Sequence, residues 1–346
     1  MSADAGRLLA ELDENWRAMG KGQEAGVLRA CAMTLIVIVR EGEDGQALGS
    51  VLAEIMHEHP NRTIVLRVGT CADPLADARG SKADAGGRSA CADPLATARG
   101  SKADAGGVEA RTAIQCWMPF GGRRQICCEQ IEISASRESL GAVPPVLFGL
   151  MVADLPVAVW SKDLELASLN ELRPVLKLAG KVMVDSAGSE DLRSAARGLR
   201  ALSGGPWRLA DLTWARVTRW RDMIARALEG VAVQGRATVT YAGPGEPAAA
   251  RYVAAWLESS VGVEVRVACE DAMAPEPGTG RIKSVSLGGL TMRRVAPTTI
   301  RIERGAVQST AVFPLWDDAT VLREELGVFG RDEQFERALA RFLEPA

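Results

Sequence analysis

The sequence is poor in histidine, which excludes much of the usual catalytic and metal-binding chemistry. Its 346 residues include only two histidines, His57 and His59. A Ser/His/Asp triad or a histidine-ligated metal site would need one of them. Two positions apart on a helix, their side chains point in different directions, and no cysteine or third histidine lies at zinc-ligand spacing. We therefore predict no catalytic residues and no metal site.

The chain also lacks a dominant charge and a long uninterrupted apolar run. Its 41 Lys and Arg nearly balance 44 Asp and Glu, so no broad positive field attracts nucleic acid or an anionic membrane. Prolines and an aspartate interrupt the most apolar stretch, residues 143–160, which excludes a membrane span of about 20 residues. The N-terminus carries charges where a signal peptide is apolar. We expect a cytoplasmic protein without nucleic-acid or membrane partners.

The seven cysteines are an odd number, as in proteins of a reducing compartment. Cys127 and Cys128 are adjacent, so in a strand their side chains face opposite sides. We expect them to be thiols, one buried and one half-exposed, with a redox role as the alternative.

Two common nucleotide and hydrolase motifs are missing. Neither early strand–helix junction carries G-x-G-x-x-G, and no G-x-S-x-G turn occurs. We expect no cofactor. The segment PFGGRR places Arg123 and Arg124 beside two glycines, which makes it a candidate anion-binding turn; a solvated turn is the alternative.

A tandem duplication is the sharpest change in composition. Residues 71–90 are followed at once by residues 91–110, which differ from them at three of twenty positions. Each copy offers one leucine among Ala, Gly, Asp and Lys, too little apolar surface for stacked repeats to build a core. We predict that residues 70–107 are a dispensable flexible insertion between two strands.

Buried strands alternate with helices in the first half. Residues 31–39 and 62–68 are apolar and rich in β-branched side chains, and a helix is expected at 46–57 between them, which is the pattern of a parallel βαβ unit. Residues 108–117 and 125–134 alternate apolar with polar positions, as a hairpin does. The first half is predicted to be an α/β domain with a Rossmann-like sheet and an added hairpin.

The second half predicts a mixed α+β domain. Residues 203–206, Ser-Gly-Gly-Pro, are the best linker candidate. We place the domains at 1–205 and 206–346, with a boundary as early as about 165 as the alternative.

One long helix is expected at 211–230, with Asp211 as its N-cap. It concentrates tryptophan, which supplies eight of the sixteen aromatic residues of the chain, together with arginine. Tryptophan and arginine are enriched at the centres of protein interfaces. The candidate partner-binding residues are Trp214, Arg216, Trp220 and Arg221, and the alternative is that the indoles fill a core.

These segments resemble a known family. The strands RACAMTLIVIV, HPNRTIVLRV and QICCEQIEI, then LPVAVWSKD, KVMVDSAG and above all DLTWARVTRWRDMIA, are similar to the glucose-6-phosphate dehydrogenase assembly proteins, OpcA. The resemblance covers most of the chain from about Leu28 onward, except residues 70–107. It implies a non-catalytic partner that promotes assembly and activation of glucose-6-phosphate dehydrogenase, at the entry to the oxidative pentose phosphate pathway.

Two other functions stay open. The chain could be an α/β enzyme or metabolite sensor that binds a sugar phosphate through Arg123 and Arg124. It could also be a scaffold that binds the dehydrogenase without changing its kinetics.

Overall fold

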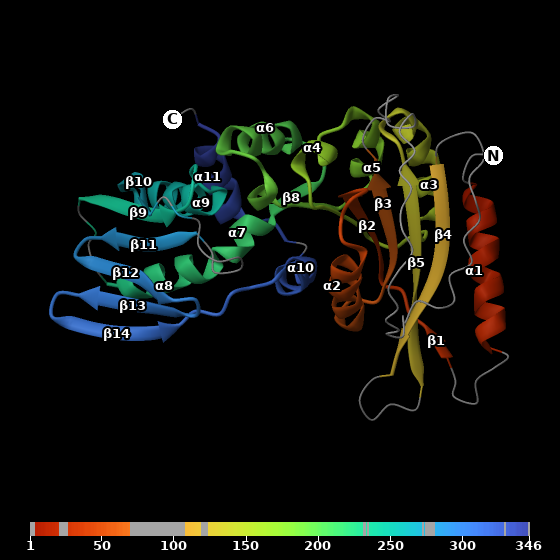
Figure 1. The fold of residues 1–346 in the computed structure, drawn as a ribbon, viewed down its shortest axis with the longest axis horizontal. Helices are drawn as coiled ribbons and strands as arrows, with labels where there is room; N and C mark the ends of the chain where they lie inside the picture. The colour runs from red at the N-terminus through yellow and green to blue at the C-terminus, as the bar shows by residue number, and fades with distance from the viewer. Residues whose placement is uncertain are drawn as a thin grey trace, which may run out of the picture. The chain divides into compact units, whose positions relative to one another are not determined.

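The chain folds into two compact units, shown in the computed structural model of Figure 1. The first comprises residues 1–160 and 169–179, and the second 161–168 and 180–346. This division lies close to residue 165, earlier than the linker candidate at 203–206. The structure describes residues 4–20, 27–69, 108–118, 124–230, 233, 235–271, 273, 281–328 and 330–344.

The first unit is built on a mainly parallel sheet. Strand β5 pairs in parallel with β3, and β3 pairs in parallel with β2; β4 is antiparallel to β5, and β6 follows β2 in the strand order. The elements are α1 (Ala5–Gly20), β1 (Val27–Arg29), β2 (Met33–Arg40), α2 (Gly45–Glu58), β3 (Asn61–Val68), β4 (Val108–Trp117), β5 (Gln125–Ala135), α3 (Val143–Leu150), β6 (Val157–Ser161) and α5 (Arg173–Leu176).

The central strands are apolar because both faces of this sheet are covered. The five residues from Leu35 to Val39 are fully buried, as the continuous apolar run predicts. The hairpin strands β4 and β5 coincide closely with the alternating segments. A Rossmann-like sheet with an added hairpin is therefore confirmed.

The second unit contains a short parallel pair and a separate six-stranded mixed sheet. Strands β7 and β8 are parallel, and the larger sheet has the order β10-β9-β11-β12-β13-β14. The α+β class of the second half is confirmed. The elements are α4 (Leu164–Ala167), β7 (Lys181–Val184), α6 (Leu192–Leu202), β8 (Arg208–Asp211), α7 (Leu212–Arg216), α8 (Thr218–Leu228), β9 (Arg236–Ala242), α9 (Ala248–Trp256), the π-helical turn Leu257–Val261, β10 (Glu264–Asp271), β11 (Ile282–Leu287), β12 (Leu290–Ala296), β13 (Thr299–Arg304), β14 (Val307–Val312), α10 (Asp318–Gly327) and α11 (Glu333–Phe342).

The prediction of one long helix at 211–230 is wrong. Val217 adopts φ −90° and ψ 3°, and its N–H bonds to the carbonyl of Trp214 at 3.2 Å rather than four residues back. The helical ladder is interrupted there, so α7 and α8 are separate helices. Asp211 does cap α7, as predicted, by accepting the N–H of Thr213 at 2.9 Å.

The cysteine prediction is also wrong for the adjacent pair. Cys127 forms a disulfide with Cys116, its register partner across β4 and β5, and Cys128 is buried with its thiol donating to the carbonyl of Ala30. Neither side chain is half-exposed, because β5 is an interior strand at this point. Burial raises the pKa of Cys128 to about 11.

The insertion at 70–107 lies outside the described residues, but its two ends are described. Gly69 donates its N–H to the carbonyl of Ala135, and Val108 is the register partner of Ala135 on the other side of β5. The two ends are therefore about two strand spacings, roughly 10 Å, apart, which three or four extended residues can span.

We expect a chain with residues 70–107 replaced by Gly-Ser-Gly-Ser to fold and to be more stable by up to about 2 kcal/mol, because shortening a flexible loop lowers its closure entropy. Urea unfolding of the first unit measures the effect. A matched variant that deletes only residues 71–90 should gain about 0.5 kcal/mol. Loss of folding in the short variant would show that the insertion contributes to the core.

Candidate functional site

The switch point of the first sheet is the usual ligand site of an open α/β fold. Strand β3 lies on one side of β2 and β6 on the other, and ligands of such sheets bind where the strand order reverses, against the N-terminus of the next helix. Here β2 leads into Glu41, Gly42, Glu43 and Asp44, directly before α2.

The chain's own carboxylates occupy this position. The Asp44 carboxylate accepts the N–H groups of Gln46 and Ala47, at 2.9 and 3.4 Å. These are the donors that a phosphate would use, and the side chains of Glu41 and Glu43 add like charge. The Asp44 carboxylate therefore competes with a pyrophosphate for these donors.

The structure describes one of the two candidate anion-binding residues. Arg124 is exposed just before β5, and Arg123 lies outside the described residues. Anion binding by this turn stays a prediction. Within the described part of the chain, no group of three or more His, Cys, Asp and Glu side chains is arranged to hold a metal ion.

In the second unit, α7 begins with a fully buried carboxylate. Asp211, at the carboxyl end of β8, accepts the N–H groups of Ser186 and Thr213 through one oxygen and the hydroxyl of Tyr252 through the other, at 2.8 Å. Burial, together with the nearby charge of Asp185, raises the pKa of Asp211 to about 6. This residue is part of the core and joins β8, α7 and α9.

The raised pKa predicts how Asp211 affects stability. An unfolded aspartate has a pKa near 3.9, so between about pH 4 and 6 the folded chain keeps a proton that the unfolded chain releases. The stabilisation of the neutral form is fully present below pH 4 and is lost as the pH rises through 6, with a cost of about 2 to 3 kcal/mol at neutral pH.

Asp211→Asn is expected to remove this cost. The asparagine carbonyl can accept the two N–H groups, and its amide can donate to the Tyr252 hydroxyl. Urea unfolding should show a gain of about 2 kcal/mol at pH 7.5 that has nearly disappeared at pH 3.5. Asp191→Asn at the exposed N-cap of α6 is the control, since hydrogen bonds from Ser194 lower the pKa of Asp191 and no gain at pH 7.5 is expected. A gain for Asp211→Asn that is equal at both pH values would contradict the titration.

Arg216 joins α7 to β7 and α10 by charge. Its two terminal nitrogens each lie 2.8 Å from an oxygen of Asp185, and one also bonds to Asp318 at 2.7 Å. Lys162 lies 3.6 Å from the same Asp318. Burial acts to lower the pKa of Arg216, but the two carboxylates outweigh it and raise the pKa above its usual value. The guanidinium is a structural cross-link.

Trp214 and Arg221 form a stacked pair across the helix break. The Arg221 guanidinium lies 3.5 Å from the centre of the Trp214 ring, and the indole N–H donates to Asp332 at 2.9 Å. Burial lowers the pKa of Arg221 to about 10, and its side chain also donates to the hydroxyl of Thr218. Trp214 is 2% exposed, so the stack belongs to the interior of the unit.

Trp220 is equally enclosed. It is 2% exposed and packs against Phe313 with ring centres 5.2 Å apart, and Arg294 lies over both rings. Of the four candidate partner-binding residues, Trp214 and Arg221 are in contact, and the two buried indoles present no face to a partner. Their role as direct contacts stays a prediction, and burial favours the core alternative for Trp214 and Trp220.

The aspartates that complete these contacts were missed at the sequence level. Asp185, Asp318 and Asp332 come from the end of β7, the start of α10 and the N-cap of α11. Of these three, only Asp185 could have been selected from the sequence, because it directly follows a predicted buried strand, where functional side chains of parallel sheets often lie.

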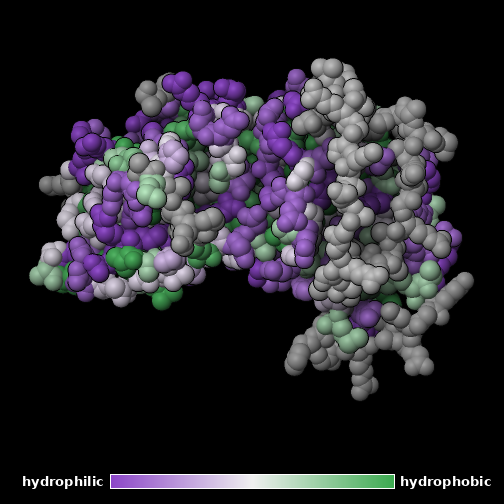
Figure 2. Space-filling model, viewed as in Figure 1, coloured by the Kyte–Doolittle hydropathy of each residue, from purple (hydrophilic) through white to green (hydrophobic). Residues whose placement is uncertain are grey.

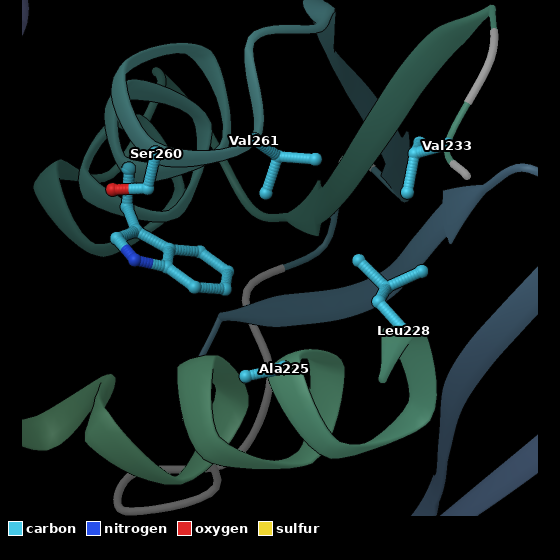
Figure 3. A pocket seen from close by; sticks show the side chains of 6 residues that line it. Ala225, Leu228, Val233, Ser260 and Val261 are labelled. Atoms are coloured by element: carbon cyan, nitrogen blue, oxygen red, sulfur yellow. The ribbon is translucent and has the colours of Figure 1, made fainter. Parts of the chain in front are cut away.

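A groove of about 410 Å³, with mostly apolar side chains around it, lies between α8 and the π-helical turn after α9 (Figure 3). Ser260 supplies its single hydroxyl, which bonds to Gln334 at 2.9 Å. No lining side chain carries a charge, so the groove does not suit a sugar phosphate, whose recognition requires cationic or several polar groups. The lining residues are Ala225, Leu228, Val233, Trp256, Ser260 and Val261.

No helix among the described residues is long and apolar enough to cross a membrane. Similarity to solved structures is at the level of overall architecture only. A biliverdin reductase from Synechocystis in complex with biliverdin and NADP+ is 10% identical with a TM-score of 0.46, covering 89% of this chain and 95% of that one. KijD10, a 3-ketoreductase from Actinomadura kijaniata, is 12% identical with a TM-score of 0.44, covering 90% and 94%.

Sequence relatives are more informative. A putative OxPP cycle protein OpcA of Synechocystis is 30% identical over 104 residues, which are 30% of this chain and 22% of that protein. The protein of the same description from Nostoc punctiforme is 27% identical over 140 residues, 39% of this chain and 30% of that one. The matched regions thus span less than a third of either relative.

Two family models match the chain in order. Residues 52–201 match the glucose-6-phosphate dehydrogenase subunit N-terminal domain, and residues 208–339 match the C-terminal domain of the same subunit. Together they cover most of the chain and include the whole Trp/Arg motif of α7 and α8. The chain belongs to the glucose-6-phosphate dehydrogenase subunit family, OpcA.

Proposed function

We propose that this chain is a non-catalytic assembly and activator subunit of glucose-6-phosphate dehydrogenase, acting in the cytoplasm at the oxidative entry to the pentose phosphate pathway. The match of both domains to the subunit family carries the proposal. The acidic loop before α2 supports it, because that loop disfavours a dinucleotide phosphate at the one position where the fold usually binds it.

An activator of this kind works by differential binding. It raises the activity of the dehydrogenase only if it binds the active form more tightly than the inactive form, by about 1.4 kcal/mol for each tenfold shift in population. The interior contacts of Trp214, Arg216 and Arg221 support a role in shaping the second unit rather than in direct contact. They hold α7, α10 and α11 in place.

The test is a titration of purified glucose-6-phosphate dehydrogenase with the full chain. We expect velocity at a fixed sub-saturating concentration of glucose 6-phosphate to rise and level off at a fixed molar ratio. Sedimentation velocity of the same mixtures should show a heavier species at that ratio. The matched control is a chain that carries Arg226→Gln and Asp222→Asn. These two changes remove an exposed ion pair of α8 and leave the interior contacts intact.

Other results would favour the other functions. A heavier species without a change in velocity would indicate a scaffold. Saturable binding of glucose 6-phosphate to the chain alone, with neither change in the dehydrogenase, would favour the sugar-phosphate enzyme or sensor and overturn the proposal.

A further inference from the structure

The larger sheet of the second unit has one edge without the usual protection. Strand β14 lies at this edge and pairs with β13 residue by residue from Val307 to Val312 without a bulge (Figure 1). Its sequence, Val-Gln-Ser-Thr-Ala-Val, contains no charge and no proline. Among the described residues, no other strand pairs with its outer side. Edge strands of natural proteins usually carry a bulge, a charged residue or a proline, because their free backbone N–H and C=O groups can otherwise pair with another strand.

The opposite edge of the same sheet shows the contrast. Strand β10 carries Glu264, Arg266, Glu270 and Asp271, and its register with β9 shifts after Cys269. Charge and irregularity both disfavour the addition of another strand at that edge. Of the two edge strands of this sheet, β10 therefore carries charges and a register shift, whereas β14 carries neither.

The open edge also exposes apolar side chains. Val307 is 70% and Val312 79% exposed, and Val295 and Leu315, from β12 and from the segment after β14, are 42% and 38% exposed. Figure 2 shows hydrophobic side chains along the lower margin of this unit, where β14 lies in Figure 1. Exposed apolar side chains beside a free strand edge are typical of a protein contact.

We propose that β14 pairs with β14 of a second copy of this chain, antiparallel and about a two-fold axis, to form a continuous twelve-stranded sheet. A two-fold interface requires a surface that is complementary to itself. Two residues that lie opposite each other in an antiparallel pair have their side chains on the same face of the sheet. In a two-fold pairing of β14 with itself, one residue must therefore lie opposite the same residue of the second copy, and the axis passes between these two. Centring on Thr310 places Thr310 opposite Thr310 of the second copy and Gln308 opposite Val312, which covers the most exposed valine.

The charges near the edge are compatible with this pairing. Among the described residues, the cation nearest the axis is Arg301, opposite Thr310 on β13. In the dimer the two copies of Arg301 lie three strand spacings, roughly 14 Å, apart, beyond the Debye length of about 8 Å at physiological salt. The Glu303 carboxylate accepts a hydrogen bond from the Gln308 side chain at 2.6 Å. No like charges meet across the axis.

The size of the contact sets the expected affinity. Five or six paired residues with a few apolar neighbours bury less than the roughly 1,200 Å² of a standard stable interface. We therefore expect a reversible dimer with a dissociation constant on the order of 10 µM. It forms without the dehydrogenase, so its test is independent of the proposed function.

Sedimentation equilibrium of the full chain alone, from about 1 to 200 µM, tests the dimer. Thr310→Lys places two ammonium groups opposite each other and should raise the dissociation constant at least tenfold. Thr310→Glu alone should do the same, whereas an equimolar mixture of the two variants should recover a mixed dimer. Recovery on mixing separates a lost contact from a misfolded chain.

Two control variants complete the experiment. Thr310→Val keeps the β-branched shape and should leave the dissociation constant unchanged. Ala268→Lys adds the same charge to the same face of the sheet at its opposite edge, on β10, and should also leave it unchanged. A wild-type chain that stays monomeric at 200 µM would overturn the proposal, and so would a dimer that Thr310→Lys does not weaken.

Discussion

Replacing Arg216 with methionine is expected to lower the free energy of unfolding of the second unit by about 3 kcal/mol at neutral pH. The substitution keeps the packing of the side-chain stem but leaves Asp185 and Asp318 facing each other without their shared cation. Breaking a buried ion pair by removing one partner costs about 3 to 5 kcal/mol. We expect the lower end because the three side chains are 24%, 13% and 30% exposed and retain some hydration.

Hydrogen exchange measured by mass spectrometry can assign this loss to the correct unit. Peptides from α7 and β7 should lose protection, whereas those from β2 and β3 should not. Arg216→Lys keeps the charge but not the two-pronged contact with Asp185 and should cost less, about 1 to 2 kcal/mol. Arg226→Met removes an exposed i,i+4 pair and should change stability by less than about 0.5 kcal/mol. Unchanged protection of α7 in Arg216→Met would contradict a structural role for this residue.

Much of the first unit could be predicted because single segments of the sequence show the pattern of a buried strand or of a hairpin. Strand β2 is a run of buried β-branched residues, and β4 and β5 alternate strictly enough for their limits to be found within a residue. Strand β8 was not predicted, because its four residues, Arg-Leu-Ala-Asp, are too few to show an alternation of apolar and polar positions. Its position depends on pairing with β7, which the sequence does not encode locally.

The four candidate residues were selected from the sequence as a group, with partner contact and core packing as the two alternatives. The structure buries both indoles, and a role in partner binding stays a prediction. The spacing of Trp214 and Trp220 is typical of both an interface and a core. The deciding groups are distant in sequence, since Arg216 bonds to Asp318 and Trp214 to Asp332, 102 and 118 positions away. The helix break at Val217 lies between Trp214 and Arg221, whose guanidinium stacks on the indole.

Glu129 of the first unit is expected to have a larger effect than Arg216, because its surroundings are drier. Its side chain is 5% exposed and pairs with Arg62, itself 7% exposed, at 2.6 Å. One oxygen also accepts the indole N–H of Trp16 at 2.7 Å and lies 2.5 Å from Arg29. Glu129 therefore joins α1 to the sheet through β5, β3 and β1.

Glu129→Leu should lower the stability of the first unit by about 4 kcal/mol, since among the described residues it leaves the buried Arg62 with the carbonyl of Leu150 as its remaining partner. Urea unfolding followed by hydrogen exchange of β5 measures the loss. Glu109→Leu on β4 is the control: its side chain is exposed, and a change below about 0.5 kcal/mol is expected there.

The double variant Glu129→Leu with Arg62→Met decides whether the loss arises from an unpaired charge or from lost packing. Removing both charges at once leaves no buried ion, and apolar replacement of a buried pair is often nearly neutral. We expect the double variant to recover at least 2 kcal/mol of the loss, leaving the cost of the unpaired Trp16 indole. A double variant no more stable than Glu129→Leu would show that the carboxylate acts through α1 packing rather than by neutralising Arg62.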